Sequence, residues 1–419
     1  MGEQQLVVSA DRYKYWVVDY ARRELLIVEQ DGTRHSEPLD VEDLPAQSPL
    51  AMSVFDWEMW WIWLHTTQKH TVIWAGFNPD SGGPPPHRPT IYLDQNKWSL
   101  LALARTAPER FESQAELLAA YQLVEWARDD GVILPVSSAH LLETSALYGQ
   151  KRYDVGITIA DLCGGWQMRH PLDVLEHEAA LALEQHQSLE PVAADRARSV
   201  VTTEPNAWQH TPEFGFGPAP DSSLETFMAM LTAPSVVVSQ LIDPEPLRRA
   251  SSTKWVDRHQ AISDQVARSS PLAYWRRRTA MRRFWNENKG FYQRALLDQH
   301  GSTEALYFSN RELTQLFGLT PMMSLLSEMF VQRFLNRQSS WKRNDLIDML
   351  FLASAAGHCD YVVAENRTGS QLRQIQKSRG ATLTVFTTLR DLVSHLDASG
   401  VTTDTQRRAL AEQSAAEHS

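Results

Sequence analysis

The sequence predicts an α/β fold, in which a mainly parallel sheet carries a large helical insertion and is preceded by a small β-rich domain. Two observations predict it. Strand-like and helix-like segments alternate after residue 90, which is typical of a parallel sheet. A stretch of mostly helical pattern, about residues 152–340, divides that alternation and is too long to be a loop.

The first 80 residues predict a small domain that is rich in β-structure. Strand-like runs at 15–20 and 24–29 flank a short turn, and Asp31-Gly32 is a second turn signal. Further along, spacings of three and four residues place four apolar side chains on one helical face, which we expect to be buried. They are Trp57, Trp60, Trp61 and Leu64.

The proline- and glycine-rich residues 81–89 are expected to be a linker, and the α/β domain then runs from about 90 to 395. The polar tail, residues 396–419, is expected to be disordered. The expected strands are 90–93, 131–136, 361–364 and 381–386. The expected helices are 98–127, one from 138, 344–356, 370–378 and 389–396.

Composition excludes several classes of protein. A net charge of −11 disfavours a protein that coats nucleic acid through a broad basic surface. Cys163 and Cys359 form no paired motif, which predicts a reduced, cytoplasmic protein without disulfide or zinc knuckle. No apolar run is long enough for a membrane span, and the glycine-rich and nucleophile motifs of kinases, dinucleotide enzymes and serine hydrolases are missing.

Acidic residues follow the predicted parallel strands. In open α/β sheets, ligands bind at the carboxyl ends of the strands. Asp94 follows the strand 90–93, and Glu365 follows the strand 361–364. Glu143 lies in the first turns of the helix after the strand 131–136. We therefore expect these three carboxylates at one edge of the sheet.

Two further acids lie one helical turn apart, at Asp345 and Asp348, and Asn344 is a suitable cap for their helix. Because that helix leads into the strand 361–364, its first turn is expected at the same edge. Stabilisation of the helix dipole is the alternative explanation for both acids. Asp360 begins the strand and should lie about 15 Å from Glu365, so we expect it to be structural.

Several carboxylates gathered at one edge repel one another unless a cation compensates them. Oxygen ligands of this kind suit Mg²⁺ or Mn²⁺ better than zinc. We therefore predict a metal site that hydrolyses phosphodiester bonds. Its predicted ligands are Asp94, Glu143, Asp348 and Glu365, with Asp345 as a further catalytic residue.

Three blocks resemble those of PIN-domain and PIN-like nucleases. They are IYLDQNKW at 91–98, LPVSSAHLLET at 134–144 and NDLIDMLFLASAAGHCDYVVAEN at 344–366. In that family an Asp ends the first strand, an acid lies in an early helix, an Asp opens a later helix, and an Asp or Asn follows the next strand. Asp94, Glu143 and Asp348 match the first three positions, and Glu365 with Asn366 occupies the fourth.

The resemblance implies a PIN-like fold and a Mg²⁺- or Mn²⁺-dependent endoribonuclease acting on RNA, with tRNA among the family's substrates. Such a nuclease could be a toxin-like or defence effector, with a regulatory protein partner or a homo-oligomer as its assembly. Two alternatives stay open: a flap-type nuclease that cuts DNA, and an inactive RNA-binding scaffold. The insertion is much larger than in compact family members.

Basic residues are candidates for substrate contact. Arg278 and Arg282 belong to the densest basic cluster and share a helical side with Trp275, which favours phosphate binding with base stacking. A solvated or partner-facing helix is the alternative. Arg169 is expected to reach a phosphate near the metals. His140 shares a helical face with Glu143 and is expected to pack or to support the site.

Overall fold

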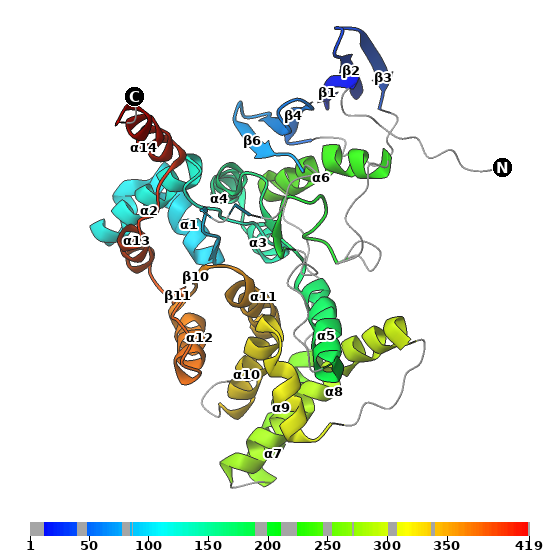
Figure 1. Ribbon diagram of the computed structural model, residues 1–419, viewed down its shortest axis with the longest axis vertical. Helices are drawn as coiled ribbons and strands as arrows, with labels where there is room; N and C mark the ends of the chain where they lie inside the picture. Colours follow the sequence, from blue (N-terminus) through cyan, green and yellow to red (C-terminus); the bar gives the residue numbers. More distant parts are fainter. Residues whose placement is uncertain are drawn as a thin grey trace, which may run out of the picture.

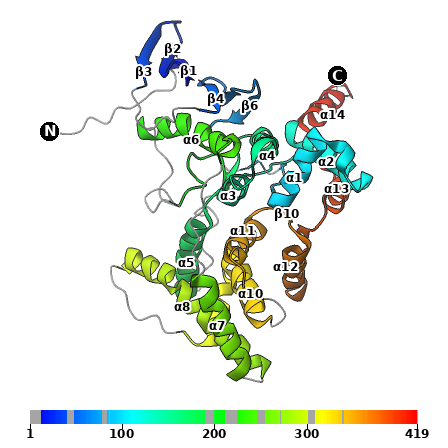
Figure 2. The same ribbon diagram turned by 180° about the vertical axis from the view of Figure 1, so that it is seen from behind.

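The structure, a computed structural model, is a mixed α/β arrangement with an antiparallel and a parallel sheet (Figure 1). Figure 2 shows from behind that the antiparallel sheet and helices α7 to α9 lie towards opposite ends of the molecule. The described residues are 12–39, 48–77, 84–85, 87–188, 199–210, 224–245, 254–269, 272–300, 308–336 and 340–417. Residues 81–83 and 86 of the expected linker therefore lie outside the described residues.

The N-terminal region forms the expected β-structure, a six-stranded antiparallel sheet in the order β3-β2-β1-β4-β5-β6. Its apolar face shares one core with helices that cover one face of the parallel sheet. In this core Trp74 donates from Nε1 to the carbonyl oxygen of Ala160 at 2.7 Å. The strands are β1 (Tyr13–Asp19), β2 (Glu24–Glu29), β3 (Arg34–Pro38), β4 (Leu50–Asp56), β5 (Trp61–Thr66) and β6 (Thr71–Ala75).

The helical face expected from Trp57 to Leu64 is wrong, because these residues form the hairpin between β4 and β5. Trp60 takes a φ of 54° in the turn, which reverses the chain. Trp57 is buried as expected, whereas 43% of Trp61 is exposed. Trp57 and Trp60 lie in the turn and Trp61 and Leu64 in β5, and this succession imitates a helical spacing of three and four.

The first strand of the parallel sheet along the chain is β7 (Ile91–Leu93), and it lies in the middle of the sheet. On one side the chain adds the segment 133–136 and then β8 (Gln167–Met168) through parallel bridges, and β9 (Val201–Thr202) pairs antiparallel to β8. On the other side it adds β10 (Tyr361–Val363) and β11 (Val385–Phe386), both parallel. The direction of winding therefore reverses between β7 and β10.

Alternate residues of this sheet enter two different cores. Leu93 and Val363 pack with the N-terminal sheet and the helices on that side. Tyr92 and Val362 pack with the helices of the insertion. The helices up to the insertion are α1 (Gln95–Thr106), the short 3-10 helix η2 (Pro108–Arg110), α2 (Gln114–Arg128), α3 (Ser138–Thr144) and α4 (Gly149–Cys163). One helix expected at 98–127 is thus interrupted before α2.

The insertion is helical as expected, but the sheet continues further than expected before it. Because β8 still pairs with the segment 133–136, the added helices begin at Pro171 and not near residue 152. They are α5 (Pro171–Ser188), α6 (Leu224–Ile242), α7 (Lys254–Ser269), α8 (Ala273–His300), α9 (Asn310–Gly318) and α10 (Pro321–Leu335). No helix in the described ranges combines the length and apolarity needed to cross a membrane.

The C-terminal part returns to the α/β pattern with α11 (Asp345–His358), α12 (Asn366–Ser378) and α13 (Leu389–Ala398). The expectation of a disordered tail is wrong as far as residue 417, because α14 (Asp404–Glu417) is helical. The start of α14 is held by Asp129, whose carbonyl oxygen accepts from the Asp404 N–H at 2.7 Å. Thr405 also donates from its hydroxyl to the Asp129 carboxylate at 3.0 Å.

Candidate active site

Asp94 and Glu365 lie side by side where the winding of the sheet reverses. Asp94 caps the N-terminus of α1, since its Oδ1 accepts from the Gln95 N–H at 2.9 Å. Its Oδ2 accepts from the Glu365 N–H at 3.2 Å, which joins the ends of two adjacent strands. Glu365 in turn accepts a hydrogen bond from the side-chain amide of Asn96. This reversal point is where open α/β sheets bind ligands.

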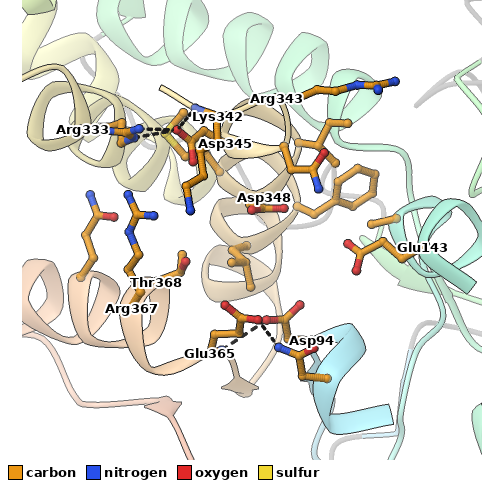
Figure 3. A pocket seen from close by; sticks show the side chains of 18 of the residues that line it. Asp94, Glu143, Arg333, Lys342, Arg343, Asp345, Asp348, Glu365, Arg367 and Thr368 are labelled. Carbon is orange, nitrogen blue, oxygen red and sulfur yellow. Dashed lines mark hydrogen bonds and ion pairs between the residues drawn. The ribbon is translucent and has the colours of Figure 1, made fainter. Parts of the chain in front are cut away.

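A pocket of about 440 Å³ opens above this pair. Figure 3 shows the carboxylates of Asp348 and Glu143 facing the same space as those of Asp94 and Glu365. The N-terminus of α11 supplies Asp348, and α3 supplies Glu143. All four predicted acids therefore line one pocket at the carboxyl ends of the strands.

The electrostatics of the pocket disfavour four ionised carboxylates. Burial, followed by the charges of Asp94, Asp345 and Glu365, raises the pKa of Asp348 to about 7. Burial, and less strongly the charge of Glu365, also raises the pKa of Asp94. Ionisation of Asp94 and Asp348 therefore costs free energy, and a bound cation would remove that cost.

Asp345 lies in the wall of the same pocket but is directed towards Arg333 (Figure 3). Its Oδ2 accepts from Arg333 Nε at 2.8 Å, from Arg333 Nη2 at 2.6 Å and from the Lys342 N–H at 2.8 Å. The Arg333 guanidinium also stacks on Trp341, 4.8 Å from the ring centre. These contacts fix the start of α11 through Asp345, and its catalytic role stays a prediction.

Basic and amide side chains that the sequence did not single out complete the pocket. Lys342, Arg343 and Arg367 line it together with Asn96, Asn344 and Gln371. Sequence proximity is the signal that marks them, since Lys342-Arg343 directly precedes the α11 acids and Arg367 follows Glu365 by two residues. The pocket therefore places cations beside an acidic floor.

His140 supports the floor of the pocket from below. It is buried, its Nδ1 accepts from the Ser137 N–H at 3.0 Å, and its Nε2 donates to the Leu93 carbonyl oxygen at 2.8 Å. Burial lowers the pKa of His140 to about 4, so the ring is neutral. Because Leu93 precedes Asp94, this bond holds the strand end that carries the acid, and the expected supporting position is confirmed.

The structure does not bring the predicted arginines to the acids. Arg169 is only 3% exposed, forms an ion pair with Glu204 and donates from Nε to the Ser199 carbonyl oxygen at 3.0 Å. The expectation that it reaches a phosphate is wrong, since this pairing occupies it inside the protein. Arg278 and Arg282 lie on α8 and neither lines the acidic pocket. Arg278 does stack on Trp275, at 5.3 Å from the ring centre.

The donor set is composed of carboxylate oxygens, which fit Mg²⁺ or Mn²⁺ in chemistry. Among the residues that the structure describes, however, no three His, Cys, Asp or Glu side chains lie close enough together to hold a metal ion as they stand. The acids share a pocket without closing on one point. Comparisons with protein-family models, with curated proteins and with solved structures gave no match.

Proposed function

We propose that this chain is a PIN-like, Mg²⁺- or Mn²⁺-dependent endoribonuclease. One observation carries the proposal: Asp94 and Glu365 lie at the winding reversal of a parallel sheet, and Asp348 and Glu143 face them across one pocket. The raised pKa of Asp348 supports a site that is built for a cation. Asp345 differs from Asp348 in that it forms an ion pair with Arg333.

Asp94, Asp348, Glu143 and Glu365 would hold the metal. A bound Mg²⁺ or Mn²⁺ supplies an activated water and neutralises charge on the scissile phosphate. Asn96 orients Glu365 through its amide, and the Leu93 carbonyl held by His140 keeps Asp94 at the strand end. The Arg333–Asp345 pair fixes the first turn of α11 and therefore the position of Asp348.

The basic residues of the pocket also suit a negatively charged phosphate backbone. Lys342, Arg343 and Arg367 line the side of the pocket beside the acids, so a polyanion can approach although the net charge of the chain is −11. The preference for RNA over DNA rests on the resemblance to PIN-like nucleases. A flap-type DNA nuclease would use the same acids, and the substrates below separate the two.

A metal-free, RNA-binding scaffold is the second candidate function. The observation that favours it is that no metal-holding group of three side chains forms among the described residues. Against it, all four positions hold carboxylates, Asp94, Glu143, Asp348 and Glu365. The proposed nuclease requires the four side chains to rotate towards an ion that neutralises them.

The test is cleavage by the purified full-length chain. We would incubate tRNA, mRNA, single-stranded DNA and duplex DNA with Mn²⁺, with Mg²⁺ or with EDTA, and repeat each reaction with Asp94→Asn. We expect RNA cleavage with either metal, loss of cleavage in EDTA, and at least about a hundredfold loss in Asp94→Asn, because a ligand of the metal is removed.

Asp397→Asn is the matched control, since Asp397 is an exposed acid on α13 and does not line the pocket. Its cleavage rate should equal that of the wild type. Cleavage that persists equally in EDTA and in Asp94→Asn would contradict the proposal. Metal-dependent cleavage of DNA alone would correct the substrate, and RNA binding without cleavage would favour the scaffold.

A further inference from the structure

A second cavity of about 530 Å³ adjoins the acidic pocket. Ile347 and Phe351 of α11 line both cavities, and α3 contributes Glu143 to the first and Leu142 to the second. Because the two cavities share lining residues, a strand with a phosphate at the acids would bring a neighbouring base to this cavity. We call the second cavity the side cavity.

The walls of the side cavity are mostly apolar and partly aromatic. Leu142 and Ile347 are large hydrophobic residues that remain 43% and 37% exposed. An exposed apolar surface next to a candidate catalytic pocket indicates ligand binding more than packing. The remaining apolar lining is Leu141, Pro171, Leu172, Trp208, Leu350 and Phe351.

Two stacked imidazoles form one wall. The rings of His170 and His210 are 5.4 Å apart with an interplanar angle of 28°, and Phe351 meets His170 edge-on at 6.1 Å. Burial, followed by the charge of His210, lowers the pKa of His170 to about 4. His210 is paired with the buried carboxylate of Asp173. At neutral pH His170 thus presents an uncharged aromatic ring beside the cavity.

Polar groups along the side cavity lack partners inside the protein. The indole Nε1 of Trp208 and the hydroxyl of Ser138 are shielded from solvent and have no hydrogen-bond partner among the described residues. Gln209 and Gln240 add side chains with amide donors and acceptors to the lining. A planar ligand with polar edges would pair with the amides of Gln209 and Gln240, whereas an aliphatic ligand would leave them without a partner in the ligand.

We propose that the side cavity binds an unpaired nucleobase of the substrate strand, next to the nucleotide whose phosphate lies at the acids. The proposal rests on the proposed function for the identity of the strand. Apolar and aromatic walls with a few polar groups are how proteins bind bases that have left a helical stack. The side cavity would therefore select single-stranded or looped RNA and would set the sequence preference beside the cut.

The test is isothermal titration calorimetry on the metal-free full-length chain. The probes are AMP, GMP, CMP, UMP, ribose 5-phosphate and phenol. We expect at least one nucleotide to bind roughly tenfold tighter than ribose 5-phosphate and phenol, because stacking and edge contacts add to the phosphate. Equal binding of ribose 5-phosphate would mean phosphate binding alone, equal binding of phenol would mean an unspecific apolar cavity, and both would overturn the proposal.

Two variants locate the binding. Trp208→Leu should lower the affinity for the preferred nucleotide roughly tenfold, because it removes an aromatic wall. Ser138→Ala should lower that affinity less. Leu118→Ala is the control, because Leu118 is an exposed hydrophobic residue of α2 outside the cavity. Should Trp208→Leu fail to fold by circular dichroism, Ser138→Ala decides, and unchanged affinity in it would overturn the proposal.

Cleavage products separate this inference from the proposed function. Nucleotide binding that Trp208→Leu weakens, in a chain that cleaves no RNA, would support the side cavity and contradict the nuclease. RNA cleavage in a chain whose side-cavity variants bind every nucleotide as the wild type does, with the same cut sites, would support the nuclease and contradict the side cavity.

Discussion

The two ends of the parallel sheet both carry carboxylates, but only at the carboxyl ends do we find partly buried acids whose pKa values are raised. At the amino ends, Asp360 accepts from the Thr90 N–H at 2.7 Å and from the Thr90 hydroxyl at 2.8 Å. At the carboxyl ends, Asp94 and Asp348 lie near other acids, and their pKa values are raised. Asp360 joins β7 to β10, whereas ionisation of Asp94 and Asp348 costs free energy, and a bound cation would reduce that cost.

The largest effect should come from Asp348→Asn. We expect RNA cleavage to fall at least about a hundredfold, because the amide removes a charged metal ligand. Initial rates of cleavage in Mn²⁺ measure this, with Asp397→Asn as the control. A rate within about twofold of the wild type would remove Asp348 from the site.

The same variant should be more stable than the wild type without metal. Because the pKa of Asp348 is raised to about 7, its ionisation costs folding free energy as the pH rises from about 4 to 7. At pH 8 in EDTA, Asp348→Asn should raise the free energy of unfolding by about 2 kcal/mol, and at pH 4 by little. Urea denaturation at both pH values measures the difference, and a destabilised variant at pH 8 would contradict the electrostatic account.

Asp360→Ala should show the opposite behaviour at the other end of the sheet. It leaves the Thr90 N–H and hydroxyl without their charged acceptor, so we expect a loss of about 1.5–3 kcal/mol in the free energy of unfolding. The folded fraction should cleave at the wild-type rate. Thermal unfolding and cleavage rates measured on the same sample check this, and a large loss of rate in folded protein would make Asp360 part of the site.

His140→Phe tests the support of the strand end. It removes the hydrogen bonds to Leu93 and Ser137. We therefore expect the free energy of unfolding to fall by about 1–2 kcal/mol at pH 7.5. Because the pKa of His140 is lowered to about 4, wild-type stability that depends on the neutral ring declines as the pH falls from about 6.5 to 4. The difference in free energy of unfolding between wild type and variant, measured by urea denaturation, should shrink over that pH interval. A constant difference would contradict this role.

The sequence predicted the acids of the site because topology places them. Asp94 and Glu365 follow strands that must be parallel, and Asp348 begins a helix that leads into one of them, so short-range patterns were sufficient. Ion pairs between residues far apart in the sequence could not be predicted in the same way. Nothing near Arg169 reveals its burial against Glu204, and nothing near Asp345 reveals that Arg333 holds it.

Short or mixed segments account for the misplaced elements. β8 comprises only Gln167 and Met168, too few residues for a periodic signal, so the start of the insertion was placed too early. The hairpin at Trp57–Trp61 mimics a helical face because its turn shifts the alternation of the strands. The sequence could not reveal the side cavity, since its lining comes from five distant segments that only the folded chain brings together.

Divalent-metal binding is the most direct measurement of the central claim that the carboxyl-end acids form a metal site. Isothermal titration calorimetry with Mn²⁺ would compare the wild type, Asp94→Asn/Asp348→Asn and the charge-matched control Asp391→Asn/Asp397→Asn on α13. We predict saturable binding to the wild type and the control, and its loss in the first double variant. No binding to the wild type, or equal binding to all three proteins, would contradict the claim.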